Sequence, residues 1–291
     1  MVATGVSAPG GDRDCILRNE RAEMHIQLDQ FRTRFDQDLK GDTELHDRVY
    51  YMVTRPKFLA LVEAMAQMPE PKKVLEIGTS RFSRQLKGVC PEWEVHTLDL
   101  DDTHQGVSEG AGVQFHIGNI LSPLPLPQGY FDLIVFSEVI EHLQGNPRLA
   151  LRHLRECLTP GGRLLLTTPN MARLINRVKS LLGRSPMPEI GPPEWWAGHM
   201  REYTFGEIAN MLRREGYSIE KGGPHMYWDG IDFYMKSGPF DRDEATGKLV
   251  FHRRFGGWKM PIGLVYSFLT NRIAQWVPSL RHGMLVVALR S

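Results

Sequence analysis

Cysteine is scarce in this chain, and the cysteines that are present do not form a motif. The 291 residues contain three, Cys15, Cys90 and Cys157, with no Cys-x-x-Cys pair among them. Disulfide frameworks and zinc ribbons need closely spaced cysteines, so this pattern argues against both. It favours a protein that folds in a reducing compartment, and we expect a cytoplasmic location.

Long apolar runs and a surplus of one charge are also lacking. No stretch reaches the roughly 18 consecutive apolar residues of a membrane-spanning helix, and residues 1–12 are small and polar, unlike a secretory signal. The formal charge is +1, from 35 basic and 34 acidic residues. This balance predicts no general attraction to nucleic acid, so we expect no DNA partner.

The chain is organised around residues 74–83, with the sequence VLEIGTSRFS. Apolar residues, the acid Glu76 and then Gly78 predict a buried strand that ends at a glycine turn, followed by a helix. This is the first unit of a doubly wound sheet, in which ligands bind at the carboxyl ends of the strands. A glycine lets the backbone approach a ligand closely. The acid suits a ligand with a positive end better than it suits a pyrophosphate, and S-adenosylmethionine carries both an ammonium and a sulfonium.

Further strands and helices alternate along the chain, which predicts a mostly parallel sheet. Asp99 ends the second expected strand, 21 residues after Gly78. A doubly wound fold places there a carboxylate that accepts hydrogen bonds from ribose hydroxyls. Other strands are expected at residues 93–98, 113–117, 131–136, 217–220 and 283–289, with helices at 83–89, 146–157 and 205–215.

Two later blocks are the most specific part of the sequence: FDLIVFSEVIEHL at residues 131–143 and LTPGGRLLLTTPN at 158–170. Together with the glycine turn, they resemble the class I S-adenosylmethionine-dependent methyltransferases of the ubiquinone-pathway and general small-molecule branch, over about residues 70–220. The resemblance implies an α/β fold with a doubly wound, Rossmann-like, seven-stranded mixed sheet whose last strand is antiparallel. It also implies S-adenosylmethionine as cofactor, with contacts from Glu76, Gly78, Ser80, Asp99, Asn119, Ile120 and Ser137.

One departure from the family pattern lies in the glycine turn. The second and third glycines of the family are replaced by Ser80 and Phe82. Ser80 is small enough for the methionine carboxylate to reach backbone N–H groups, whereas Phe82 does not permit the same close approach. We therefore expect a rearranged loop or a more loosely held cofactor, and a non-catalytic binding protein remains an alternative.

The remaining segments divide the chain into four parts. Residues 1–68 are expected to form a leader and a helical cap, 69–220 the methyltransferase core, 221–282 an insertion, and 283–291 the last core strand. The leading helices either cover the cofactor or substrate mouth or pack on the edge of the sheet. The insertion is too long for a featureless loop and should be structured.

Acids and histidines after the fourth strand are the candidates for chemistry. His142 suits a general base near neutrality. Glu138, Glu141 and His142 stand at i, i+3 and i+4, one face of a helix. A similar Glu-x-x-Glu-His binds a divalent metal in ubiquinone-pathway O-methyltransferases and small-RNA 2′-O-methyltransferases, and by the same resemblance His199 is the fourth ligand and a second catalytic candidate. Mn²⁺, Fe²⁺ or Zn²⁺ would suit this set. Acids also favour the first turn of any helix, without a metal.

Residues 258–277 carry an apolar stripe with tryptophans at both ends, inside a segment that has no acid from Ala245 onward and a formal charge of +7. Such a helix either lies in a membrane interface, at the inner face of the membrane, or docks on the sheet.

Taken with the resemblance, these features lead us to expect an O-methyltransferase for a small-molecule, sugar or lipid-linked acceptor. Metal-assisted RNA 2′-O-methylation is the alternative, with RNA disfavoured by the near-zero net charge.

Overall fold

The computed structural model of the chain describes residues 28–37, 45–187, 198–225, 240–242, 249–251, 273–274 and 276–291. Side chains are described for these residues except for 45–54, 240–242 and 249–251. The predicted helix at 258–277 falls largely outside the described residues. Of the expected leader and helical cap, residues 1–27 and 38–44 also fall outside them.

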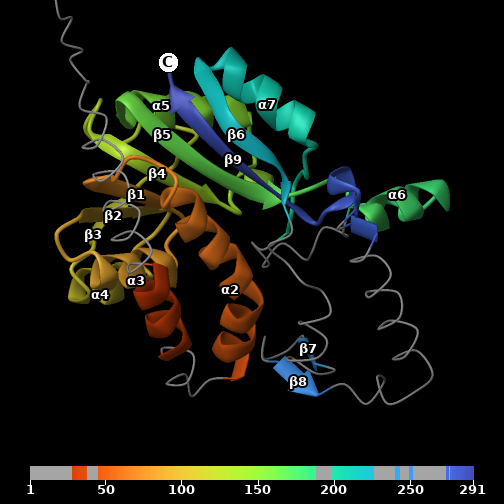
Figure 1. Cartoon of the computed structure of the whole chain (residues 1–291), viewed down its shortest axis with the longest axis horizontal. Helices are drawn as coiled ribbons and strands as arrows, with labels where there is room; N and C mark the ends of the chain where they lie inside the picture. Colours follow the sequence, from red (N-terminus) through yellow and green to blue (C-terminus); the bar gives the residue numbers. More distant parts are fainter. Residues whose placement is uncertain are drawn as a thin grey trace, which may run out of the picture.

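A seven-stranded sheet in the order β3-β2-β1-β4-β5-β9-β6 forms the centre of the molecule (Figure 1). The first five strands are parallel, and β9 runs antiparallel to both of its neighbours, β5 and β6. This confirms the predicted mixed sheet with an antiparallel last strand. The strands are β1 (Lys73–Ile77), β2 (Glu94–Asp99), β3 (Gln114–Ile117), β4 (Phe131–Ser137), β5 (Leu158–Pro169), β6 (Tyr217–His225) and β9 (Gly283–Arg290).

Helices cover both faces of the sheet, which explains the nearly continuous apolar runs in its strands. In β1, Val74 packs into one core with α3, whereas Leu75 packs into the other core with α5 and α7. After a first helix at residues 28–37, the described residues form α2 (Leu45–Met65), α3 (Arg81–Val89), α4 (Gln105–Gly110), α5 (Pro147–Cys157), α6 (Leu174–Leu181) and α7 (Phe205–Arg214), with 3₁₀ turns η1 (Ile140–His142) and η3 (Pro278–Leu280).

The leading helices pack on a face of the sheet, in the same core as α3. Phe31 and Phe35 of the helix at residues 28–37 are 1% exposed and share this core with Phe58 of α2. The ring of Phe82 lies 5.6 Å from the rings of both Phe31 and Phe58. The ring of Phe82 therefore points into the core and not into the glycine turn, and the more loosely held cofactor stays a prediction. This ring anchors the start of α3.

Some residues of the segment between β6 and β9 are described by the structure. The segment contains a two-stranded antiparallel sheet of β7 (Phe240–Arg242) and β8 (Leu249–Phe251). Near its end, Ala274 is buried while Trp276 is 86% exposed. Among the described residues, no helix combines the length and apolar character needed to cross a membrane.

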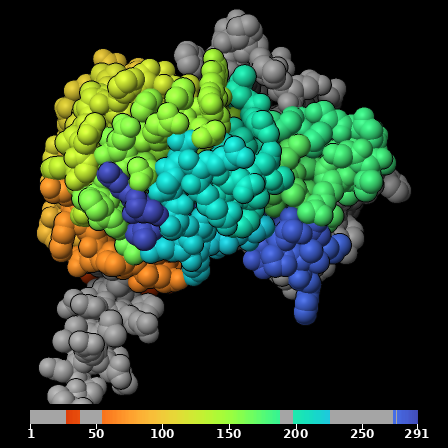
Figure 2. Space-filling model, turned by 90° about the horizontal axis from the view of Figure 1, so that it is seen from above, coloured from red at the N-terminus to blue at the C-terminus, as the bar shows by residue number. Residues whose placement is uncertain are grey.

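The start of α6 and the residues before β9 lie side by side at one end of the molecule. Figures 1 and 2 both show them together, in green and blue. Asn170, which follows β5, joins them, because its Nδ2 donates to the carbonyl oxygens of Ser279 (3.1 Å) and Arg281 (2.9 Å). The end of β5 is thereby tied to the far end of the insertion.

Candidate functional site

Polar residues gather at the carboxyl ends of β1, β2, β4 and β5. Gly78 directly follows β1, Asp99 ends β2, Ser137 ends β4, and Thr168 lies near the end of β5. The strand order reverses between β1 and β4, and ligands of doubly wound sheets bind at this switch point. The structure therefore brings the predicted residues Gly78, Asp99 and Ser137 to one edge of the sheet, where Thr168 also lies.

Gly78 has a backbone conformation that only glycine adopts easily. Its φ angle is +78°, and a Cβ atom there would stand 3.0 Å from Cγ2 of Val139. Its N–H donates to the carbonyl oxygen of Leu98 at 2.9 Å, which ties the turn to β2. A side chain here would be strained both by the backbone angle and by its neighbour.

The buried carboxylate of Glu76 accepts hydrogen bonds from the loop that follows Gly78. One carboxylate oxygen accepts from the hydroxyl of Ser80 at 2.5 Å, and the other lies 3.3 Å from the backbone nitrogens of Ser80 and Ser83. Burial raises the pKa of Glu76, and these hydrogen bonds oppose the shift. Ser80 in turn caps α3, since its Oγ accepts from the N–H of Phe82 at 3.0 Å. Glu76 and Ser80 thus act together to fix the loop.

Asp99 is oriented by the same turn. Its Oδ2 accepts from the N–H of Thr79 at 2.9 Å, and its Oδ1 accepts from the N–H of Leu100 at 2.8 Å. Each carboxylate oxygen has a second lone pair, so the group can still accept from a ligand. Asp99 and the glycine turn are therefore neighbours, as their spacing in the sequence predicts.

The other predicted cofactor residues occupy the loop ends beside this turn. Asn119 follows β3 and is exposed; its Oδ1 accepts from the N–H of Leu121 at 2.9 Å, which closes a turn of the type that asparagine favours. Ile120 beside it is 5% exposed. Ser137 shares a 2.8 Å hydrogen bond with the hydroxyl of Thr167.

Glu138, Glu141 and His142 do not share a helical face, so this part of the sequence interpretation is wrong. Glu138 has a φ angle of 54°, which breaks the chain direction directly after β4. Residues 140–142 form only the 3₁₀ turn η1, and the next α-helix begins at Pro147 behind its cap Asn146. Because of this break, Glu138 is not part of the group that Glu141 and His142 form.

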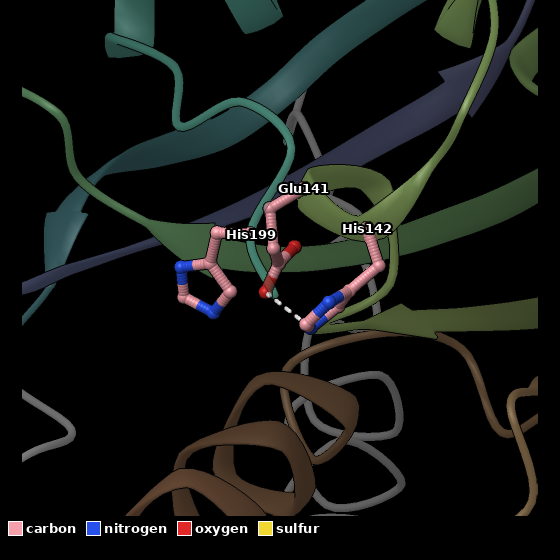
Figure 3. A group of neighbouring side chains, drawn as sticks. All are labelled: Glu141, His142 and His199. Atoms are coloured by element: carbon pink, nitrogen blue, oxygen red, sulfur yellow. Dashed lines mark ion pairs between the residues drawn. The ribbon is translucent and has the colours of Figure 1, made fainter. Parts of the chain in front are cut away.

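Glu141, His142 and His199 do come together, with one ligand atom of each within 4.8 Å of the others. The imidazole rings are 4.9 Å apart and nearly perpendicular, and His142 Nε2 lies 3.9 Å from Glu141 Oε1. In the view of Figure 3, the Glu141 carboxylate lies between the two rings. His199 is held there because the N–H groups of Met200 and Arg201 donate to the backbone carbonyl of Glu141, at 2.8 and 3.1 Å.

Hydrogen bonds behind these side chains leave acceptor atoms facing the site. His142 Nδ1 lies 3.1 Å from the carbonyl oxygen of Gly198, which only accepts, so Nδ1 carries the hydrogen and neutral His142 has its lone pair on Nε2. Glu141 is 1% exposed; its Oε2 accepts from Thr168 at 2.9 Å, while its buried Oε1 has no hydrogen-bond partner in the described chain.

The electrostatics follow from burial. Burial raises the pKa of the Glu141 carboxyl well above its usual range, with a further contribution from the charge of Glu138. Burial and then the neighbouring His199 lower the pKa of His142. His142 is therefore a neutral acceptor near neutral pH, and the group offers the nitrogen and oxygen donors that bind divalent metals or take up a proton.

Two contributors to this site were missed in the sequence. Thr168 hydrogen-bonds Glu141, and its only signal was its place at the end of the fifth strand. Glu202 hydrogen-bonds His199 through Oε1 at 3.1 Å. The sequence shows that Glu202 lies three residues after His199. It does not show that Arg173 and Asn176, from an earlier segment, also bind this carboxylate.

The strand order, the glycine turn after β1 and the carboxylate at the end of β2 define a class I S-adenosylmethionine-dependent methyltransferase. Residues 46–221 match the family described as "Methyltransferase domain", and the chain belongs to this family. S-Adenosylmethionine is therefore its cofactor.

The chain is similar to several methyltransferases over part of its length. A Mycolicibacterium smegmatis protein named "Probable S-adenosylmethionine-dependent methyltransferase" is 32% identical over 109 residues, 37% of this chain and 36% of the relative. A Paenibacillus malonyl-acyl-carrier-protein O-methyltransferase is 26% identical over 147 residues, 46% of this chain and 52% of the relative. The matches thus span about half or less of these relatives.

A solved structure supports the same fold. A Haloferax volcanii methyltransferase in complex with the Trm112 methyltransferase activator superposes with a TM-score of 0.50 at 15% identity, covering 84% of this chain and 94% of that one. At this identity the likeness concerns the fold alone.

Proposed function

We propose that this protein transfers a methyl group from S-adenosylmethionine to a hydroxyl oxygen of a small-molecule acceptor, beside Glu141, His142 and His199. The observation that carries the proposal is the grouping of these three side chains at the end of β4, with Nε2 of His142 as an acceptor. The similarity to an O-methyltransferase supports oxygen as the target atom. Sugar and lipid-linked hydroxyl compounds are the acceptor classes we favour.

The cofactor would lie across the carboxyl ends of β1, β2 and β4. The turn at Gly78, free of a Cβ, fits the methionine end, and its loop is fixed by Glu76 and Ser80. Asp99 has lone pairs for the ribose hydroxyls. Asn119 and Ile120 follow the neighbouring strand, where they would contact the adenine, and Ser137 would contact the cofactor at the end of β4.

The chemistry asks little of the protein beyond positioning. When bound, S-adenosylmethionine supplies an activated methyl group that an acceptor oxygen takes up by in-line displacement. His142 Nε2 accepts the proton that the hydroxyl loses. Glu141 Oε1 lies 3.9 Å from that nitrogen, so an oxygen atom stands next to the ring as it takes up the proton.

A divalent metal fits the same residues. The buried Glu141 Oε1 without a hydrogen-bond partner, and two imidazoles whose Nδ1 atoms are held from behind, form a donor set of the kind that Zn²⁺, Fe²⁺ or Mn²⁺ takes. We propose that Glu141, His142 and His199 would hold such an ion. Such an ion would supply polarisation of the acceptor hydroxyl. Because Nε2 of His142 would then be a metal ligand, the hydroxyl proton would pass to solvent and not to His142.

The test uses the full chain with S-adenosylmethionine labelled in its methyl group and a panel of phenols, quinols and glycosides. We expect label in hydroxyl acceptors and none in the same compounds with that hydroxyl already methylated. Transfer to amines instead would overturn the proposal of O-methylation. Calorimetric binding of S-adenosylmethionine without any transfer would favour the non-catalytic alternative.

A chelator arm of this assay separates the two roles of the histidines. If a metal assists, the purified protein retains it by elemental analysis, and chelation lowers transfer until Zn²⁺ or Mn²⁺ is added back. Full transfer by protein without metal would leave His142 as the base and remove the metal from the proposal. RNA 2′-O-methylation, which the metal-type donor set favours, is tested by adding a short single-stranded RNA to the panel.

We also propose that residues 258–277 bind the inner membrane face peripherally, in a cytoplasmic protein. The 86% exposure of Trp276 and the acid-free sequence around it support this. Co-sedimentation with anionic vesicles should fall with added salt and with Trp276→Ser. Equal binding to neutral and anionic vesicles would contradict the electrostatic part of this proposal.

A further inference from the structure

A buried carboxylate stands behind His199. The side chain of Glu202 is 1% exposed, and His199 Nδ1 lies 3.1 Å from its Oε1. Arg173 donates to both oxygens, at 2.6 and 2.9 Å, and Asn176 Nδ2 donates to Oε2 at 3.1 Å. Within the described part of the chain, three residues thus donate hydrogen bonds to the side chain of Glu202.

These partners come from two segments far apart in the sequence. Arg173 and Asn176 belong to the start of α6, whereas His199 and Glu202 lie just before α7. Asn176 Nδ2 also donates to the carbonyl oxygen of Met171 at 3.1 Å, which fixes its own orientation. Residues at the start of α6 therefore fix the position of the Glu202 carboxylate by hydrogen bonds.

The contacts of Glu202 are those of an ionised carboxylate, because the guanidinium of Arg173 donates to both of its oxygens and Asn176 donates to Oε2. An ionised carboxylate only accepts hydrogen bonds. The nitrogen of His199 that faces it must therefore carry the hydrogen, and neutral His199 has its lone pair on Nε2.

His142 has the same arrangement, with the carbonyl oxygen of Gly198 in the place of the carboxylate. Both rings thus face the site with an unprotonated Nε2, and in each case an acceptor behind the ring sets the tautomer. Acceptors of this kind orient imidazoles and raise their basicity in many metal and acid–base sites.

We propose that Glu202, clamped by Arg173 and Asn176, is a positioning residue that sets the tautomer and ring orientation of His199 at the Glu141–His142–His199 group. This inference rests on the proposed role of that group, and it adds a residue that the sequence interpretation did not include. A buried ion pair is by itself weak evidence for a stabilising role. We therefore assign the Arg173–Glu202 pair a role in the site and not in stability alone.

The tautomer can be read directly in the unmodified protein. Nitrogen-15 labelling of histidines and long-range proton–nitrogen NMR spectra distinguish a protonated Nδ1 from a protonated Nε2, and His199→Gln assigns the signals. We expect His199 with its hydrogen on Nδ1. A hydrogen on Nε2 of His199 in the parent protein would overturn the proposal, and this measurement needs neither metal nor acceptor.

Glu202→Gln supplies the second test, because an amide can either accept from or donate to the ring. We expect a mixture of His199 tautomers and, where the parent binds Zn²⁺, a 10- to 100-fold weaker affinity. Retention of the parent tautomer in Glu202→Gln would overturn the proposal. A parent that binds no Zn²⁺ but has the expected tautomer would refute the metal and leave the positioning role supported.

Glu207→Gln is the matched control. Glu207 is also a hydrogen-bonded glutamate of this segment; it closes the capping box of α7 with Thr204 and does not contact His199. We expect this variant to lose thermal stability while the His199 tautomer and the Zn²⁺ affinity stay as in the parent. Equal changes in both variants would mean that Glu202 acts only through the fold.

Discussion

A His142→Gln variant should lose methyl transfer by about 10²- to 10⁴-fold, the usual contribution of a positioned general base, while its affinity for S-adenosylmethionine stays unchanged. The reason is geometric. Nε2 of His142 is an acceptor at the end of β4 because Nδ1 donates to the carbonyl oxygen of Gly198. The glycine turn and Asp99, which we propose bind the cofactor, lie on other strands.

The measurement is a kinetic comparison with the hydroxyl acceptor found in the labelled assay, alongside calorimetry with S-adenosylmethionine. His104→Gln is the control, since His104 is an exposed histidine that precedes α4. It should behave like the parent in both assays. A His142→Gln variant with parental turnover would remove His142 from the chemistry, whether as base or as metal ligand.

Replacing Gly78 by valine should weaken S-adenosylmethionine binding strongly. The φ angle of +78° strains a β-branched residue, and its Cβ would stand 3.0 Å from Cγ2 of Val139. Backbone strain of this kind costs about 1–3 kcal/mol. If the turn moves to relieve it, the binding loss is about 10- to 100-fold, at about 1.4 kcal/mol for each factor of ten.

Gly206→Val is the matched control, because a Cβ at Gly206 in α7 meets no atom within 4 Å and its φ angle is not positive. Calorimetry on both variants, with circular dichroism to verify folding, separates a local effect from unfolding. We expect parental affinity for Gly206→Val. Parental affinity for Gly78→Val would mean that the cofactor does not lie against this turn.

Much of the fold could be predicted because its signals are local. The apolar runs at 74–77 and 131–136 become β1 and β4. The helix expected at 205–215 becomes α7, which begins at a capping box on Thr204 and is followed by Gly216 with a φ angle of +80°. The antiparallel last strand came from the family resemblance, since the run at 283–289 carries no information about its direction. Parallel strands between covering helices leave few other arrangements for this pattern.

The candidate site was less predictable, because it depends on where side chains point. Spacing placed Glu138, Glu141 and His142 on one helical face, but the left-handed backbone at Glu138 and the short turn η1 separate the first acid from the other two residues. Phe82 occupies the place of a glycine in the family pattern, yet its ring turns into the core.

The sequence by itself determined the strands, the glycine turn and the place of Asp99 at the end of β2, because each depends on a short run of residues. Only the tertiary structure decided which polar groups meet. His199 lies beside His142 because the N–H groups of the two residues after it donate to the backbone carbonyl of Glu141. Glu202 is held by Arg173, which belongs to an earlier segment of the chain. Such contacts depend on how α6 and the start of α7 pack at the end of the sheet. Packing is a property of the whole fold, so no local pattern of residues specifies it.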